Sequence, residues 1–148
     1  MQEIKIKLQH PNVKVPTYAT DGAGCFDIYA DLPPSCISCR VTADTPTEIE
    51  TGLSFEIPEG KALLVFSRSG HGFKNGVRLA NAVGVLDSDY RGVLKVKLTA
   101  DGDGALVVKH GDRIAQGMII DAPQVTFKVV DKLSDTERGI GGFGSTGG

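Results

Sequence analysis

Turn-forming residues at short intervals constrain this chain more than any other feature of its sequence. Nineteen glycines and seven prolines are spread through the 148 residues, so few stretches can form a helix of ordinary length. No apolar stripe with the 3.6-residue period of a helix is sustained anywhere. We expect at most short helical turns, at 69–74 or 82–85.

Between these turns lie segments of strand length. Ile4, Ile6 and Leu8 alternate with polar residues, and 125–130 has the same alternation, which predicts strands with one buried face. The expected strands are 3–8, 25–30, 51–57, 61–66, 93–99, 105–108, 113–120 and 125–130. Many short strands separated by glycine and proline turns predict an all-β fold, an antiparallel jelly-roll-like β-barrel or sandwich.

The length predicts one β domain, which we place at 1–137. In the remainder, 138–148, six of eleven residues are glycine, which predicts a flexible C-terminal lid segment. Phe143 has no apolar neighbour there, so it either belongs to a loose end or covers a flat ligand ring. In the second case Arg138, Ser145 and Thr146 would bind phosphate oxygens.

The charge balance excludes some classes of function. Sixteen Lys and Arg against eighteen Asp and Glu, a net charge of -2, leave no basic surplus for tracking polymeric nucleic acid. The longest apolar run, 62–66, is far shorter than the roughly 20 residues of a membrane helix.

Three cysteines, an odd number, suit a reducing compartment, so we expect a cytoplasmic protein without membrane contact. Cys36 and Cys39 have the spacing of a metal knuckle but lack further ligands, so zinc is not expected.

Three short motifs carry candidate chemistry. Arg68 follows an apolar strand within Ser-Arg-Ser-Gly, which suits an anion or, alternatively, a solvated turn. Asp87 lies in the acidic stretch 84–92, where it could act as a general base or simply form an Asp-rich turn. Asp27 lies within an apolar strand and points either inward, paired or near a metal, or outward to solvent.

Taken in order, five stretches resemble the five motifs of the trimeric deoxyuridine triphosphatase (dUTPase) family. They are 16–30, 67–70, 84–92, 111–116 and the glycine-rich 138–146. The resemblance implies a jelly roll assembled as a homotrimer with three active sites at subunit junctions. It also implies hydrolysis of dUTP to dUMP and pyrophosphate, with Mg²⁺ held by the triphosphate and water attacking the α-phosphorus. This reaction limits uracil incorporation into DNA and supplies dUMP for dTTP synthesis.

The resemblance also implies roles for individual residues. Asp87 would orient and deprotonate the water, and Gln116 would help to place it. Tyr90 would exclude a 2′-hydroxyl, while the turn 79–84 would read uracil and exclude the methyl group of thymine. Asp27 would hold the waters on Mg²⁺. The substrate-binding residues implied are Arg68, Ser69, Gly70, Asn81, Gly84, Tyr90, Arg138, Phe143, Gly144, Ser145 and Thr146.

Two departures from the family pattern and two alternatives accompany this interpretation. Ser67 stands where the family usually has a proline, from which we expect little loss, and 98–104 lacks an asparagine associated with subunit contacts. A dCTP deaminase shares the fold and an Arg-Ser motif, but this chain is short for that family and carries the tail typical of dUTP hydrolysis. The other alternative is a nucleotide-gated protein that binds a protein partner.

Overall fold

The structure is a computed structural model that describes residues 3–142, and it contains twelve strands and one short helix. In chain order these are β1 (Lys5–Leu8), β2 (Thr17–Tyr18), β3 (Phe26–Tyr29), β4 (Ser38–Thr42), β5 (Thr47–Glu50), β6 (Leu53–Glu56), β7 (Lys61–Phe66), α1 (Ser69–Asn75), β8 (Val77–Leu79), β9 (Val83–Leu86), β10 (Lys95–Ala100), β11 (Ala105–Lys109) and β12 (Arg113–Asp121).

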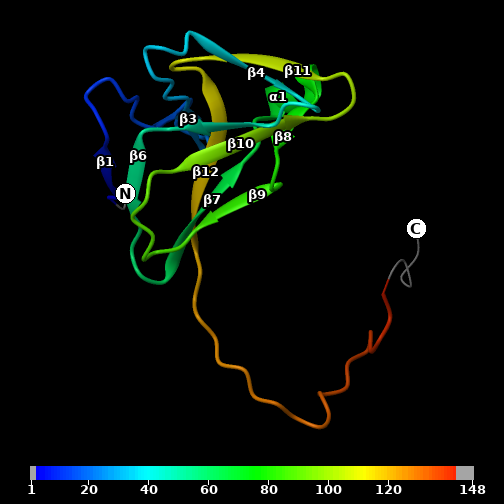
Figure 1. Ribbon diagram of the computed structural model, residues 1–148. Helices are drawn as coiled ribbons and strands as arrows, with labels where there is room; N and C mark the ends of the chain where they lie inside the picture. Colours follow the sequence, from blue (N-terminus) through cyan, green and yellow to red (C-terminus); the bar gives the residue numbers. More distant parts are fainter. Residues whose placement is uncertain (1–2, 143–148) are drawn as a thin grey trace.

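Every strand pair is antiparallel, which confirms the all-β prediction of an antiparallel, jelly-roll-like architecture. The largest sheet has the order β2-β3-β12-β7-β9, and a second has the order β5-β10-β8. Two further pairs, β1-β6 and β11-β4, complete the body (Figure 1). The one helix of the described residues, α1, is too short to cross a membrane.

One hydrophobic core joins these sheets. Ile28 and Leu63 enter it from the five-stranded sheet, Val96 from β10, Val41 from β4 and Phe55 from β6, and all five are buried. In β10 the buried residues alternate with outward lysines, whereas β3 and β6 each bury three consecutive residues. Because each sheet contributes to the same core, the ends of β3, β7 and β12 are fixed relative to one another.

Two sequence predictions are wrong. The expected helical turn at 82–85 is absent, because residues 83–85 belong to β9, which pairs with β7. The segment 125–130 forms no strand, because no strand within residues 3–142 pairs with it. Its alternating side chains are instead exposed, Phe127 to 94% and Val129 to 96%. By contrast, the predicted helical turn at 69–74 is confirmed as α1.

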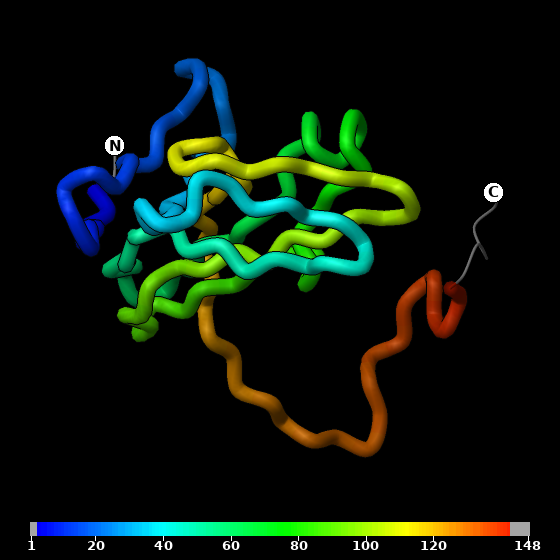
Figure 2. The backbone as a smooth tube through the Cα atoms, turned by 45° about the horizontal axis from the view of Figure 1, so that its top comes forward, coloured from blue at the N-terminus to red at the C-terminus, as the bar shows by residue number. Residues whose placement is uncertain are grey.

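The last strand ends at Asp121, and the chain then leaves the body as an extended segment, 122–142 (Figures 1 and 2). The division at residue 137 between domain and lid stays a prediction. Seven of the eight expected strands are present, with boundaries shifted by at most a few residues. The unexpected strands β2, β4, β5, β8 and β9 are short, and each is held by a long-range partner.

Candidate active site

Two predicted site residues lie side by side on neighbouring strands. Asp27 of β3 is paired with Gln116 of β12, and Gln116 is paired in turn with Phe66 at the end of β7. Residues paired across an antiparallel ladder present their side chains on the same face of the sheet. The five-stranded sheet therefore brings the first and fourth motifs together, next to the point where the second motif begins.

Asp27 points inward and is held by two arginines. It is 8% exposed, and its Oδ1 accepts a hydrogen bond from Arg68 Nε at 3.2 Å while its Oδ2 accepts one from Arg113 Nη1 at 3.2 Å. These partners offset the cost of removing the carboxylate from water. One carboxylate between two guanidinium groups leaves a net positive charge that suits a phosphate. We call Asp27, Arg68, Arg113 and Gln116 the arginine cluster.

The Ser-Arg-Ser-Gly segment leads from the arginine cluster into α1. Arg68 is extended and precedes the first helical residue, so Ser69 and Gly70 form the exposed start of α1. The hydroxyl of Ser67 accepts a hydrogen bond from the Leu79 N–H at 2.9 Å. A proline at this position has no hydroxyl, so Ser67 supplies a contact to β8 that the family's usual residue could not make.

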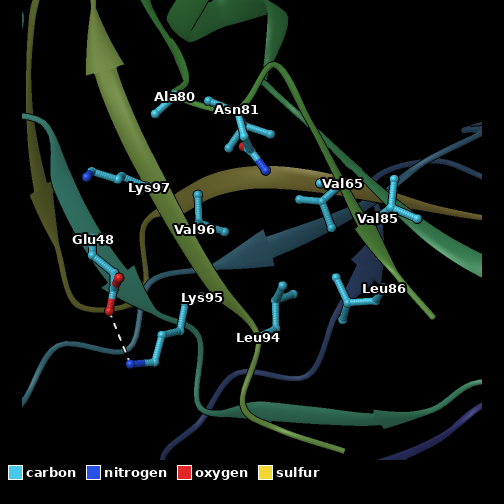
Figure 3. A pocket seen from close by; sticks show the side chains of 12 residues that line it. Glu48, Val65, Ala80, Asn81, Val85, Leu86, Leu94, Lys95, Val96 and Lys97 are labelled. Atoms are coloured by element: carbon cyan, nitrogen blue, oxygen red, sulfur yellow. Dashed lines mark hydrogen bonds and ion pairs between the residues drawn. The ribbon is translucent and has the colours of Figure 1, made fainter. Parts of the chain in front are cut away.

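A hollow of about 440 Å³ lies between the β8–β9 turn and β10. The turn is tight: Ala82 has a left-handed φ of 62°, and the Val83 N–H donates to the Asn81 carbonyl at 2.7 Å. Figure 3 shows the Asn81 side chain pointing from the turn into this hollow, above Val96. Gly84, without a side chain, leaves room beside Asn81. We call this space the β8–β9 hollow.

Asp87 and Tyr90 line a second hollow, of about 230 Å³, which shares Leu86 and Leu94 with the β8–β9 hollow. The Tyr90 N–H donates to the Asp87 carbonyl, which closes the turn after β9. A Cβ on Gly92 would lie 2.3 Å from Tyr90 Oη, so only glycine allows this position of the ring. The Asp87 side chain is exposed at the mouth of the hollow.

Asp87 and the arginine cluster do not meet within one chain. Val83 is paired with Phe66, beside the cluster, whereas Leu86 is paired with Leu63, and Asp87 follows it. The four residue steps from Val83 to Asp87 correspond to roughly 13 Å along the strand. The structure therefore gathers the predicted residues into two separate groups, the arginine cluster with Ser69 and Gly70, and the hollow residues Asn81, Gly84, Asp87 and Tyr90.

Arg138 lies apart from both groups. It is in the extended C-terminal segment, where its Nε donates to the Gly141 carbonyl at 2.9 Å within a local turn. Its role in binding a ligand stays a prediction. Phe143, Gly144, Ser145 and Thr146, the other predicted lid residues, lie outside the described residues.

Two residues of the site region were missed by the sequence analysis. Neither Arg113 nor His71 was assigned a role, yet Arg113 binds Asp27 and the Nε2 of His71 lies 2.7 Å from the Arg113 carbonyl. The available signal was the place of Arg113 at the start of an apolar strand. Its partner could not be identified, because the sequence does not show that β12 pairs with β3.

The cysteines and the carboxylates of the site region bear on whether the chain could hold a metal ion. Cys25, Cys36 and Cys39 are free thiols, and burial raises the pKa of Cys39, helped by the neighbouring Cys36. Within residues 3–142, no group of three or more His, Cys, Asp or Glu side chains is placed to hold a metal ion. Asp27 is therefore the one carboxylate that the arginine cluster offers to a cation.

Comparison with known proteins identifies relatives along almost the whole chain. A family model described as dUTPase matches residues 11–147. The deoxyuridine 5′-triphosphate nucleotidohydrolase of Dinoroseobacter shibae is 44% identical over 143 residues, covering 91% of this chain and 88% of its own. The enzyme of the same name from Desulfitobacterium hafniense is 42% identical over 152 residues, covering 99% of both chains.

Solved structures show the same fold. A variant of the dUTPase of Staphylococcus bacteriophage 80alpha, determined with dUpNHpp, superposes with a TM-score of 0.86 and covers 99% of both chains. The two sequences are 23% identical, so this likeness bears on the architecture alone.

Proposed function

The chain belongs to the dUTPase family, and from this premise we propose how its two groups of residues hydrolyse dUTP to dUMP and pyrophosphate. One observation carries the proposal: a cluster with surplus positive charge and a separate hollow that ends at a carboxylate are both present. The cluster suits a triphosphate, and the hollow suits a nucleoside.

The β8–β9 hollow would bind deoxyuridine. Asn81 would read the edge of uracil, and the tight turn beside Gly84 would leave no space for the methyl group of thymine. Tyr90 would lie against the deoxyribose, where a 2′-hydroxyl would collide with its ring. Selection by exclusion needs a closely fitting wall, which the left-handed turn and the contact of Tyr90 over Gly92 would provide.

The arginine cluster would bind the phosphates. Arg68, with Ser69 and Gly70, would contact the α- and β-phosphates, and Arg113 adds positive charge beside them. Arg138 would clamp the γ-phosphate as Phe143 covers the base, and Gly144, Ser145 and Thr146 would complete this lid. The lid is proposed from the family motif, and the exposed position of Arg138 leaves its side chain available for such a movement.

Asp87 would act as the general base. It would accept a proton from water while the water oxygen bonds to the α-phosphorus and the bond from that phosphorus to the bridging oxygen breaks. Pyrophosphate then leaves with the bonding electrons. Gln116 would hold the water or a phosphate oxygen in line for this attack, so both side chains act through their positions.

Mg²⁺ is the cofactor we propose, and the residues present fit a cation that arrives with the triphosphate. Both oxygens of Asp27 already bind an arginine, so the carboxylate would reach the ion only through bound water. When bound, the ion neutralises phosphate charge that builds up during the displacement. The chain's own contribution is to hold those waters with Asp27 and the phosphates with Arg68.

A homotrimer with shared sites would unite the two groups. Asp87 lies roughly 13 Å along β9 from the paired residues Gln116, Phe66 and Val83. A neighbouring copy would therefore supply one of the two groups to each site. The exposed alternating segment 125–130 is a further surface that an assembly would cover.

We place the reaction in the reducing cytoplasm, to which the three free thiols are suited, and there it would limit uracil in DNA and supply dUMP.

The test is a substrate panel. Purified protein with Mg²⁺ is mixed separately with dUTP, UTP, dTTP and dCTP, and the release of pyrophosphate and of ammonia is followed in parallel. Pyrophosphate from dUTP, with little from the other three, is the expected result. Ammonia from dCTP would identify a deaminase instead, and no release from any nucleotide would favour a protein that only binds nucleotides.

A further inference from the structure

Packing does little to hold the helix α1 in place. None of its residues is buried, and Phe73, its aromatic residue, is 94% exposed. Arg68, which precedes the helix, makes no capping hydrogen bond with its side chain. A helix of seven residues without a buried face is not stable by itself, so its position depends on individual contacts.

His71 provides the specific contact. Its Nε2 lies 2.7 Å from the carbonyl oxygen of Arg113, and because a carbonyl can only accept, Nε2 carries the hydrogen. Among the side-chain hydrogen bonds found within residues 3–142, this is the only one that joins α1 to a sheet.

The contact closes a ring of interactions. Arg68 and Arg113 bind the two oxygens of Asp27, and His71, three residues after Arg68, returns to the backbone of Arg113. Arg68, His71 and Arg113 line a hollow of about 280 Å³ at the start of α1. The ring links β3, β12 and the β7–α1 junction, so Ser69 and Gly70, which lie inside it, are held from both sides.

We propose that His71 is a positioning residue that holds Ser69 and Gly70 in place to bind the phosphates of the substrate. The inference rests on the phosphate-binding role proposed above for 68–70. Losing the hydrogen bond would let α1 move and would weaken binding of the triphosphate. It would leave binding of the nucleoside unchanged, because the β8–β9 hollow lies elsewhere in the chain.

The test compares three variants. His71→Leu removes the bond, and His71→Gln keeps an N–H donor of similar reach. His10→Gln is a matched control, since His10 forms a hydrogen bond of 2.9 Å with Asp31, outside both site groups. Calorimetry measures the affinity for a non-hydrolysable dUTP analogue and for deoxyuridine, and hydrogen exchange follows the amides of 69–75.

We expect His71→Leu to bind the analogue about five- to tenfold more weakly, the usual effect of one lost hydrogen bond, with deoxyuridine affinity unchanged and faster exchange confined to α1. His71→Gln should recover most of the affinity. If the leucine variant does not fold, His71→Asn, too short to reach the carbonyl, undergoes the same measurements. Equal analogue affinity in wild type and variant would overturn the inference, whereas a wild type that neither binds nor hydrolyses would overturn the proposed function.

Discussion

At the scale of single residues, Asp27 shows how burial and charge combine in this protein. Its carboxylate lies within the five-stranded sheet, and two guanidinium groups neutralise it. Removing the negative charge would leave the arginines close together without a counter-charge. The same arrangement that stabilises the fold therefore sets the positive potential that we assign to phosphate binding.

We predict that Asp27→Asn lowers the free energy of unfolding by about 2–4 kcal/mol, because it removes the charge of a buried carboxylate that two arginines bind. Urea denaturation measures the change. Asp44→Asn, at an exposed position, is the control and should be nearly neutral. Equal midpoints for the two variants would mean that the arginines do not depend on Asp27.

Gly92 is a second residue-scale feature, because a side chain there would overlap the ring of Tyr90. We predict that Gly92→Ala displaces the ring and lowers kcat/KM for dUTP about tenfold or more, while the preference for dUTP over UTP shrinks. Steady-state kinetics with both nucleotides gives this ratio. Gly22→Ala is the control, since nothing lies within 4 Å of the Cβ it would add. An unchanged preference would remove Tyr90 from sugar selection.

At the scale of elements, ion pairs tie neighbouring strands at their ends. Arg78 of β8 donates from Nε to both oxygens of Asp101, which follows β10, at 3.1 and 2.9 Å. This hydrogen bond lowers the pKa of Asp101. Both side chains are largely exposed, so salt screens the pair and its contribution to stability is small.

The sign of the pH dependence follows from the lowered pKa. The pair stabilises the fold above the ordinary aspartate pKa and loses this effect as the pH falls through the lower, folded-state value. We predict that Arg78→Gln is slightly less stable than wild type at neutral pH and that the difference narrows below about pH 4. Thermal unfolding from pH 7 to 3 tests this. Arg40→Gln, which breaks no ion pair among residues 3–142, should show no such narrowing.

The element scale also explains the errors in the helix and strand predictions. The segments 82–85 and 125–130 are both apolar and short, and pattern alone cannot distinguish their fates. The first is a strand because β7 offers it an edge, and the second is not because no edge within the described chain is paired with it. Strand formation in both cases depends on a partner more than on intrinsic preference.

At the scale of the whole molecule, the separation of the two site groups is the main finding. Asp87 follows the last residue of β9. Gln116 is paired with Phe66, which is paired in turn with the first residue of β9, Val83. A single copy can therefore present the hollow that we assign to the nucleoside and the cluster that we assign to the phosphates without aligning them on one substrate. An assembly that exchanges these groups between copies would build complete sites.

Mixing two inactive variants tests this assembly. Asp87→Asn lacks the base, and Arg68→Gln lacks a phosphate ligand, so we expect each alone to lose turnover by orders of magnitude. Co-expressed in one oligomer, they should regain about a quarter of wild-type activity, because random assembly pairs two intact groups at that frequency. Asp87→Asn mixed with Asp87→Ala must stay inactive. Absence of recovery in the first mixture would place both groups of each site on one copy.

Much of this protein was predictable from its sequence. Glycine and proline spacing with period-two alternation determined the all-β class and most strands, because both features act over a few residues. The motif resemblance identified the family and singled out Asp27, Arg68, Asn81, Asp87 and Gln116.

Only the tertiary structure decided how these residues meet. It paired Asp27 with Arg113, joined His71 to the backbone of β12 and separated Asp87 from Gln116. Each of these outcomes depends on which strands lie side by side and in which register. Local alternation specifies the face of a strand on which a side chain lies, but the neighbouring strand is selected by burial of the common core, to which distant segments contribute together.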